Sequence, residues 1–525
     1  MRSAIRSNRA RQAVSYTQSI PAPVNGWDAT NPISEIEESR AYQLDNWVPR
    51  PGYVEMRRGY TEWSKAFSAP VETLLVWRGP SAEKMFAASG TSISNVTVES
   101  STTATVAVSS TVNARWQYVN ASTAGGHFIV AVNGATDPRQ YDGTTWSIAT
   151  ITGSGLTAAN LIHVMAHQNR LFFIEKSTLN FWYLDTVEAI KGAASKFPLG
   201  AIFGKGGYLV AQGSWTFDGG TGQDDLAVFV TSEGEAAIYQ GSDPGDATAW
   251  ALVGVFEIGV PLGPRAIIKW GSDLAVVTTN GVMPLSAILV SDRTKQQKAA
   301  LTARIQNAYA VAAQRALGSF GWEVVAYPKG NLIIVNVPWQ AGSSYRQYVM
   351  NSITGAWCRW LGMNALTWAV YNDEIYFGGL THVCRADRGS SDAGEAITAD
   401  LTGAYLYYGT RGALKQFKML RPIFETNRAI VPALEMAVDF QNIDPVAQPS
   451  LAASNASQWG SSQWGTAQWG SANEISANWT GVSGLGIAGA IRARVVTQGG
   501  TARQAVNSTI KLISFDVVYE RGGVL

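Results

Sequence analysis

Between about residues 71 and 390 the sequence is a succession of short apolar or alternating runs, each followed by a polar turn. The runs include TLLVW, RLFFIEK, LAVFVTS and LIIVNVP, and they are rich in β-branched and aromatic residues. Turn pairs such as Asn133-Gly134 and Asn372-Asp373 separate them. Because only a few residues separate neighbouring runs in stretches such as LTWAVYNDEIYFGGL, the pattern predicts antiparallel hairpins. The chain is therefore predicted to be mainly β.

A loose repeat runs through the same region. Three times a strand ends in a polar turn that a tryptophan closes, in YDGTTW (141–146), GDATAW (245–250) and NSITGAW (351–357). Hairpins that recur at blade-like intervals, each with an aromatic residue at its turn, are typical of a β-propeller. The sequence therefore predicts a β-propeller body over residues 71–394. The spacing is irregular, so it does not fix the number of blades; five or six are expected, and a large β-sandwich is the structural alternative.

One segment of this body departs from the strand pattern. In SDRTKQQKAALTARIQNAYAVAAQRALG (291–318), apolar residues recur every three or four positions, and Gly318 stands at a C-cap position. The segment is predicted to be one long helix inserted between blades. Its apolar face includes Leu301, Ile305 and Tyr309, which are candidates for contact with another subunit or, equally, for packing on their own blades.

Residues 1–70 are predicted to form an N-terminal arm followed by an irregular lead-in segment. The arm carries Arg2, Arg6, Arg9 and Arg11, and it has no acidic residue. A basic arm of this kind usually orders on a neighbouring molecule. Contact with another subunit is its expected role, and contact with nucleic acid is the weaker alternative.

Residues 395–525 are predicted to form a separate antiparallel β-domain around a tryptophan-rich loop at 455–480. The loop places Trp459, Trp464 and Trp469 at five-residue spacing among Ser, Gly, Ala and Asn. These small residues cannot build a core, yet tryptophan is costly to leave in water. The loop is therefore expected to pack on its own domain or on a neighbouring subunit, with sugar or base binding as the alternative.

Three patterns resemble known cofactor or metal sites by letter, but none has the sequence context that such a site requires. The triplet GLGIAG (484–489) matches the dinucleotide fingerprint by letter, but a strand rather than a helix is expected after it. His163 and His167 have the spacing of helical zinc ligands, but on the strand expected here they stand about 13 Å apart. The acidic run DGGTGQDD (218–225) lacks the ligand spacing of a calcium loop. The chain is expected to have no cofactor, no metal and no enzymatic activity.

Composition also limits the partners. A net charge of +1 with 15% charged residues gives no global attraction to nucleic acid or to a membrane surface. No apolar run approaches the roughly 20 residues that a membrane-spanning helix needs. Cys358 and Cys384 are too few for a disulfide framework or a zinc site, so we expect buried thiols in a protein made in a reducing cytoplasm.

Three parts of the sequence resemble the tail nozzle proteins of short-tailed bacteriophages, the family also called tail tubular protein B. They are LDNWVPRPGYVEMRRGY (44–60), the stretch NSITGAWCRWLGMNALTWAVYNDEIYFGGLTHVCRAD (351–387), and the serial QWG loop together with the ending VVYERGGVL. The resemblance extends over nearly the whole chain and is firmest from about residue 320 onward. None of these motifs is a catalytic signature.

The resemblance implies a structural virion protein with a β-propeller body. About six copies would form a ring below the tail adaptor protein, as the distal tube of a short tail, with fibres or spikes around it and double-stranded DNA passing through its lumen. Such a protein is made in the host bacterial cytoplasm and resides in the virion tail. A carbohydrate-binding or receptor-binding propeller of the tail is the main alternative. A glycan-cleaving propeller is a third, because its paired carboxylates could lie far apart in the sequence.

Overall fold

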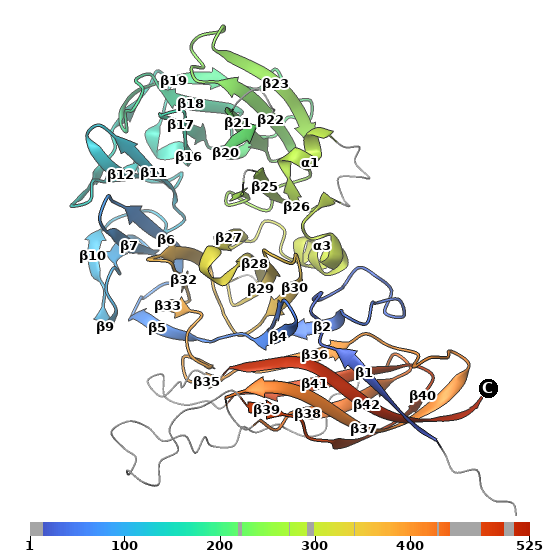
Figure 1. The fold of residues 1–525 in the computed structure, drawn as a ribbon. Coiled ribbons are helices and arrows are strands. Elements are labelled where there is room, and N and C mark those ends of the chain that lie inside the picture. The colour runs from blue at the N-terminus through green and yellow to red at the C-terminus, as the bar shows by residue number, and fades with distance from the viewer. Residues whose placement is uncertain are drawn as a thin grey trace, which may run out of the picture. The chain divides into compact units, whose positions relative to one another are not determined.

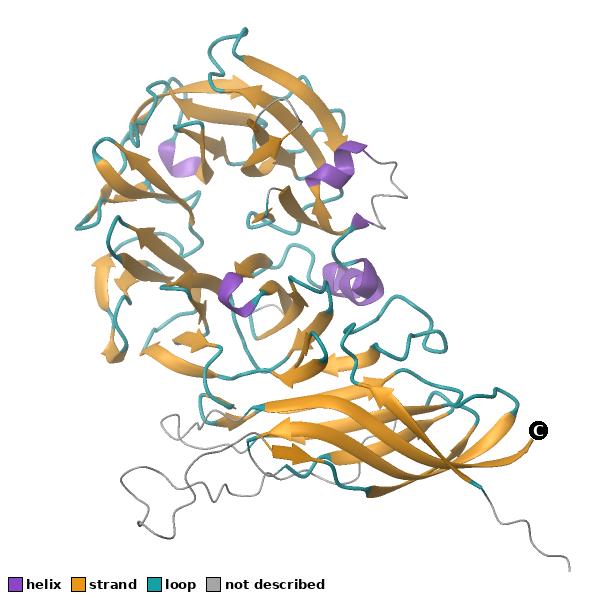
Figure 2. Ribbon diagram, viewed as in Figure 1, coloured by secondary structure: helices purple, strands orange, loops and turns teal. Residues whose placement is uncertain are grey.

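The computed structural model describes residues 14–218, 223–271, 273–290, 299–340, 342–427, 430–441, 474–497 and 509–524. They are mostly strands, with a few short helices (Figure 2), which confirms the mainly β prediction. The described residues between 58 and 395 form one compact unit, here called the propeller. Residues 14–57 and the described residues from 396 onward form a second, here called the terminal unit.

Five blades of the propeller are sheets of their own, in which each strand pairs antiparallel with the next. The first is β6 (Val71–Arg78), β7 (Glu83–Ser89), β8 (Ser92–Asn95) and β10 (Thr105–Val108). The second is β11 (Gln117–Thr123), β12 (Gly126–Val132), β13 (Arg139–Tyr141) and β14 (Trp146–Ile148). The third is β16 (Leu161–His167), β17 (Arg170–Glu175), β18 (Asn180–Leu184) and β19 (Gly192–Pro198), with η1 (Ala158–Asn160) before it and β15 (Ile151–Thr152) parallel to β19. The fourth is β20 (Leu209–Asp218), β21 (Gln223–Thr231), β22 (Glu235–Gly241) and β23 (Trp250–Glu257), and the fifth is β24 (Ile267–Trp270), β25 (Asp273–Thr278) and β26 (Gly281–Pro284).

Two further four-stranded meanders complete the ring (Figure 1). The sixth blade is β27 (Glu323–Tyr327), β28 (Leu332–Gln340), β29 (Ser344–Asn351) and β30 (Trp357–Trp360), with η3 (Pro328–Gly330) between its first two strands. The seventh is β31 (Thr367–Tyr371), β32 (Glu374–Gly378), β33 (Val383–Ala386) and β5 (Tyr60–Lys65). Each innermost strand contacts the innermost strand of the next blade, in the closed order β6, β11, β16, β20, β24, β27, β31 and back to β6. The β-propeller prediction is therefore confirmed, and the described strands form seven blades where five or six were expected.

The seventh blade closes the ring by joining distant parts of the chain. Its outermost strand β5 comes from the start of the propeller, whereas its other three strands come from the end. Two short strands, β9 (Ser100–Thr103) and β34 (Ser391–Asp392), add to β5, and β35 (Glu395–Ala396) follows β34. Just before β5, a side chain at Gly59 would place its Cβ 1.9 Å from the carbonyl oxygen of Ser391, so only glycine allows this approach.

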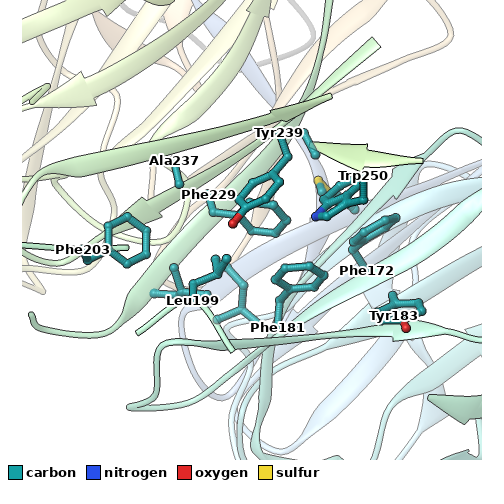
Figure 3. Close-up of a cluster of buried hydrophobic side chains, with 13 residues drawn as sticks. Phe172, Phe181, Tyr183, Leu199, Phe203, Phe229, Ala237, Tyr239 and Trp250 are labelled. Carbon is teal, nitrogen blue, oxygen red and sulfur yellow. The ribbon is translucent and has the colours of Figure 1, made fainter. Parts of the chain in front are cut away.

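The core of the propeller lies between blades. Where the third and fourth blades meet, aromatic side chains pack on one another (Figure 3), with the Phe181 and Phe229 ring centres 4.4 Å apart and those of Tyr239 and Trp250 5.1 Å apart. Trp250 is also one of the three tryptophans of the loose repeat. These tryptophans open the outermost strands β14, β23 and β30, after the same polar turn in the second, fourth and sixth blades. The repeat therefore marks the last hairpin of alternate blades.

The inserted helix is shorter than the 28 residues of the predicted segment, of which 291–298 lie outside the described residues. Within the described part, α3 runs over Gln306–Arg315 and is preceded by η2 (Ala303–Ile305), while the short helix α1 (Leu285–Val290) lies upstream. The helix cannot extend further toward its N-terminus because the Leu301 amide donates to the Val282 carbonyl and the Thr302 hydroxyl accepts from the Val282 amide. These bonds hold the backbone before η2 against β26 instead of in a helical turn.

The terminal unit contains two antiparallel sheets built from both ends of the chain. In the first, the long strand β42 (Ile510–Val524) pairs with β37 (Ala413–Thr426), β1 (Ser15–Pro21) and β4 (Tyr53–Met56), and the sheet also holds β3 (Trp47–Arg50), β39 (Glu474–Ser476) and β40 (Thr480–Gly486). The second contains β2 (Ala41–Asp45), β36 (Thr398–Gly403), β41 (Gly489–Val496) and β38 (Ala433–Val438) in that order. The C-terminal antiparallel β-domain is thus present. Residues 15–57 belong to it, so the division differs from the predicted separate segment 1–70.

Candidate functional site

The innermost strands surround a cavity of about 250 Å³ on the axis of the propeller. Apolar residues of the innermost strands, such as Leu74 and Val164, pack between blades, and the polar residue just before each of them, Thr73 or His163, lines the cavity. Every blade contributes at least one polar side chain to the lining, and one from each blade is considered below. These side chains are Thr73, Gln117, His163, Gln212, Arg265, Glu323 and Thr367.

Arg265, which lies just before β24, ties four other blades together across the axis. Its guanidinium donates to the Thr73 hydroxyl at 2.6 Å, to the Trp116 carbonyl at 3.2 Å and to the Thr367 hydroxyl at 3.0 Å. The same group is 3.4 Å from the Glu323 carboxylate, and the side chains of this ion pair are only 8% and 16% exposed. Arg265 therefore connects five blades of the propeller through one side chain.

Glu323 depends on that pairing because it is buried. Burial raises the pKa of the Glu323 carboxyl above its ordinary value, while the Arg265 guanidinium and the Trp368 amide, which donates at 3.1 Å, act in the opposite direction. Without the guanidinium, the carboxylate would face a large desolvation cost with two neutral donors, the Trp368 amide and the Thr367 hydroxyl, in place of a charged partner.

The opposite side of the lining, formed by β11, β16 and β20, has a different character. Gln117 Nε2, His163 Nδ1 and Gln212 Oε1 are buried, and none of them has a hydrogen-bond partner among the described residues. The Gln212 amide is itself fixed, because its Nε2 donates to the Phe172 carbonyl at 2.7 Å. One side of the lining thus carries a network of hydrogen bonds around Arg265, whereas the other contains polar atoms that are buried from the cavity and have no partner among the described residues.

We expect His163 to make the stability of the propeller depend on pH. Burial lowers the pKa of His163 from 6.5 to about 4, so the folded protein resists the protonation that the unfolded chain accepts. The resulting stability is fully present above about pH 6.5 and is lost as the pH falls toward 4, by roughly 2 to 3 kcal/mol in total. The measurement is chemical denaturation between pH 7 and 4, in which the His163→Leu protein should lose this much less stability than the original.

The neighbouring variant Gln117→Leu serves as the control for this prediction. It changes the same cavity without removing a titrating group, so it should keep the original pH dependence. Glu323 responds in the opposite sense, because a raised pKa favours folding as the pH falls, but its contribution cancels when the two proteins are compared. Parallel pH profiles for His163→Leu and the original protein would contradict the prediction.

The residues predicted for interaction fall in three different places. Trp459, Trp464 and Trp469, and the arginines Arg2, Arg6, Arg9 and Arg11, lie outside the described residues. Ile305 and Tyr309 are fully buried within the propeller, where the Tyr309 hydroxyl donates to the Thr278 carbonyl at 2.8 Å. The Leu301 carbonyl accepts from the Trp357 indole at 3.0 Å. Of the two roles considered for this face, packing on its own blades is the one that the structure displays.

The patterns set aside in the sequence have structural explanations. Gly484 and Gly486 belong to β40 and Gly489 begins β41, and a side chain at Gly489 would place its Cβ 2.6 Å from the Phe417 ring. This triplet therefore serves close packing of a hairpin. His163 and His167 lie on β16, as expected, and His167 contacts the Ser214 hydroxyl and the Gly241 carbonyl at 2.9 Å each.

Other expectations can be compared with the described part of the chain in the same way. Cys358 and Cys384 are both buried. The described residues hold no cluster of three or more histidine, cysteine or acidic side chains that could bind a metal ion, and no helix among them is long and apolar enough to cross a membrane. Asp224 and Asp225 lie on β21, so this end of the acidic run is part of a strand instead of a loop.

Of the seven polar side chains named above, only His163 was considered from the sequence, as a possible zinc ligand, and the structure gives it a different place. The signal that could have found the others is positional. Most of them occupy one of the first four positions of an innermost strand, and Arg265 lies two positions before one. Such a set becomes visible only once the order of the blades is known.

No protein-family model matches the chain, and no curated protein sequence matches it. Several solved structures are similar at low identity. Sqt1 from Saccharomyces cerevisiae is 11% identical with a TM-score of 0.37, covering 63% of this chain and 98% of its own. The β-propeller domain of Cps50 (Swd1) from Myceliophthora thermophila is 10% identical with a TM-score of 0.35, covering 64% and 99%. An exo-β-1,3-galactanase from Phanerochaete chrysosporium is 11% identical with a TM-score of 0.28, covering 76% and 95%. Matches at these TM-scores are too distant to support a function for this chain.

Proposed function

We propose that this protein is a structural component of a bacteriophage virion that forms the distal tube, or nozzle, of a short tail. Several copies, about six by the resemblance to the nozzle family, would close into a ring beneath the tail adaptor, because a tube of identical subunits requires a closed rotational arrangement. Double-stranded DNA would pass through the lumen between the copies during ejection. Tail fibres or spikes would attach around the ring, and no catalytic step would be involved.

The observation that carries this proposal is the place of the resembling segments in the fold. The stretch 44–60 forms β3 and β4 and leads into β5, the strand that closes the propeller. The stretch 351–387 provides β30 and the other three strands of the seventh blade, and the ending 517–525 lies largely in β42. The segments shared in pattern with the nozzle family therefore form closing elements of the two units. Because these segments close the fold, what the chain shares in pattern with the nozzle family is better explained by a structural role than by a shared binding pocket.

The polar lining of the propeller axis also fits a scaffold. Arg265, just before β24, is bonded to residues of four other blades across the axis. A propeller braced in this way behaves as a stiff block. DNA would then pass through the lumen between the copies, and each propeller would form part of the wall of that lumen.

The test is to quantify this protein by mass spectrometry in purified particles of the source virus, with the portal protein as the internal reference. We expect about half as many copies as portal subunits, which a ring of about six below a portal of about twelve requires. Absence of the protein from purified particles would overturn the proposal. A separate arm uses particles in which Trp459, Trp464 and Trp469 are all changed to alanine.

This second arm separates the nozzle from a receptor-binding tail protein. If the tryptophans pack against neighbouring copies, the triple variant should produce particles that lack an assembled tail. If they instead hold a host sugar, particles of normal composition should assemble but fail to adsorb, and that outcome would favour the receptor-binding alternative. Electron microscopy of the particles and an adsorption assay provide the two measurements.

A further inference from the structure

The propeller divides its charge between blades, although the chain as a whole is almost neutral. The fourth blade, residues 209–257, contains eight acidic residues and no lysine or arginine. In contrast, residues 293–372, which include α3 and the sixth blade, contain eight lysines and arginines, and their one acidic residue is the buried Glu323. Figure 1 shows β23 of the fourth blade and α3 both at the outer rim of the propeller. Two parts of the rim therefore belong to segments of opposite charge.

The acidic part of the rim includes an open strand edge. β23 is the outermost strand of its blade, and among the described strands it pairs only with β22. Its residues Leu252 and Val253 are 42% and 49% exposed. Glu233 in the turn before β22 and Asp246 in the loop before β23 are also exposed, and neither forms an ion pair with a described residue. These four residues, here called the acidic edge, combine apolar area with uncompensated negative charge.

The basic part of the rim is the outer face of η2 and α3. Arg304, Val311 and Arg315 recur at spacings of seven and four positions, which places them on one face of the helical segment, and all three are exposed. Leu317, just after α3, is 58% exposed. Within the described part of the chain, neither arginine forms an ion pair. These four residues are here called the basic face.

The position of one charge on the basic face is fixed by its neighbours. The Arg315 guanidinium lies over the Trp339 ring at 4.6 Å, and its Nε donates to the Trp339 carbonyl at 3.0 Å. Val311 precedes Arg315 by four positions, so the two side chains are neighbours on the helix surface. A partner that approaches this face therefore meets a held positive charge next to exposed apolar area.

The acidic edge and the basic face complement each other. Each combines exposed apolar side chains, which gain from being covered, with charges of one sign, and the two signs are opposite. DNA would meet favourable charge only on the basic face, and a basic peptide only on the acidic edge. A second copy of the chain matches both surfaces, because it carries the two halves of the contact itself. We propose that copies of this chain associate head to tail, with the acidic edge of one copy against the basic face of the next.

Such a contact uses two different surfaces of each copy, and contacts of this type either close into a ring or grow into a filament. The inference deepens the proposed function, since it names the surfaces through which the ring of copies would form. It rests on that proposal for the closure into a ring. The contact itself depends only on the propeller, so it can be measured with the purified protein alone.

The test is sedimentation velocity of the purified full-length protein over a series of protein concentrations. We expect the sedimentation coefficient to rise with protein concentration, and to rise less at high salt, because salt screens exposed charges. The edge variant combines Glu233→Lys with Asp246→Asn, since an asparagine oxygen can still accept from the Thr248 amide as Asp246 does. The face variant combines Arg304→Glu with Arg315→Glu. Each should weaken the association by about tenfold or more.

A protein that carries both sets of substitutions provides the decisive comparison. Its edge is positive and its face is negative, so attraction between copies returns and most of the lost association should be recovered. A matched control combines Asp137→Lys with Asp185→Asn, at exposed positions of the second and third blades, and changes the net charge as the edge variant does. This control should associate like the original protein. Every variant is first checked for cooperative unfolding.

Recovery in the combined protein supports the proposal, because damage to the fold would add up instead of cancelling. Three results would overturn the proposal: no association of the original protein at any concentration, equal weakening by the control, or no recovery in the combined protein. None of them bears on the copy number in purified particles, so a failure of this contact can be told apart from a failure of the proposed function.

Discussion

Replacing Arg265 with methionine is expected to lower the free energy of unfolding of the propeller by about 3 to 5 kcal/mol, because removing one partner of a buried ion pair strands the other. Methionine keeps most of the volume but none of the donors. Glu323 would then remain buried with the Trp368 amide and the Thr367 hydroxyl as hydrogen-bond donors but without a charged partner, and Thr73 and Thr367 would each lose a bond across the axis. Chemical denaturation at neutral pH measures the loss.

Arg115 provides a matched control for this experiment. Both guanidinium groups lie over the same Phe320 ring, at 4.5 Å for Arg115 and 5.1 Å for Arg265. Arg115 is paired with Glu72 but is 55% exposed, so Arg115→Met should cost less than about 1 kcal/mol. Equal losses for the two variants would show that the bonds across the axis add nothing beyond those at the surface.

The pH dependence gives an independent check on the cause. Burial raises the pKa of Glu323, so the carboxyl is neutralised more readily in the folded state as the pH falls. The Arg265→Met protein should therefore recover part of its deficit at low pH, where no uncompensated charge remains. A deficit that does not change with pH would attribute the loss to packing alone.

Much of the propeller could be predicted because its signals are local. The run RLFFIEK became β17 and LAVFVTS became part of β21, since alternating apolar residues and turn residues act over a few positions. Asn372 and Asp373 both adopt the positive φ angles, 48° and 56°, that a tight hairpin turn requires. The buried face of α3 was also predicted correctly, whereas its start was not, because the bonds of Leu301 and Thr302 to Val282 depend on a strand that ended 17 residues earlier.

The two closures of the fold could not be predicted, because they join residues from opposite ends of the sequence. Ser19 on β1 hydrogen-bonds to Asp516 on β42, a separation of 497 positions, and β5 completes a blade whose other strands begin at Thr367. Residues 15–57 look irregular in the sequence because their strands are short and pair with distant partners. Nothing in their own pattern shows what those partners are.

The axial cavity lies beyond sequence analysis for a similar reason. Gln117, His163 and Gln212 are each an ordinary polar residue near the start of a strand. They become a set only because successive blades place their innermost strands side by side. Burial then makes His163 and Glu323 unusual in their pKa, and a sequence contains no direct record of burial.

The second large effect is expected at Phe181, where alanine should destabilise the propeller by about 3 to 5 kcal/mol. Phe181 is fully buried on β18 of the third blade, and its ring stacks on Phe229 of the fourth blade and on Phe197 of its own, with centres 4.4 Å and 5.0 Å apart. The variant would leave a cavity between two blades whose contact is largely aromatic (Figure 3). Chemical denaturation followed by tryptophan fluorescence measures the loss, since Trp250 lies in the same cluster.

Two further variants show whether the loss comes from the contact between blades. Phe181→Leu keeps most of the buried apolar volume and should cost clearly less than alanine, because the space between blades stays filled. Phe256→Ala removes a partly buried ring from β23 that is not in the cluster, so it should also cost less. If Phe181→Ala costs no more than Phe256→Ala, the third and fourth blades would be held together mainly by other contacts, such as the Gln212 bond to the Phe172 carbonyl.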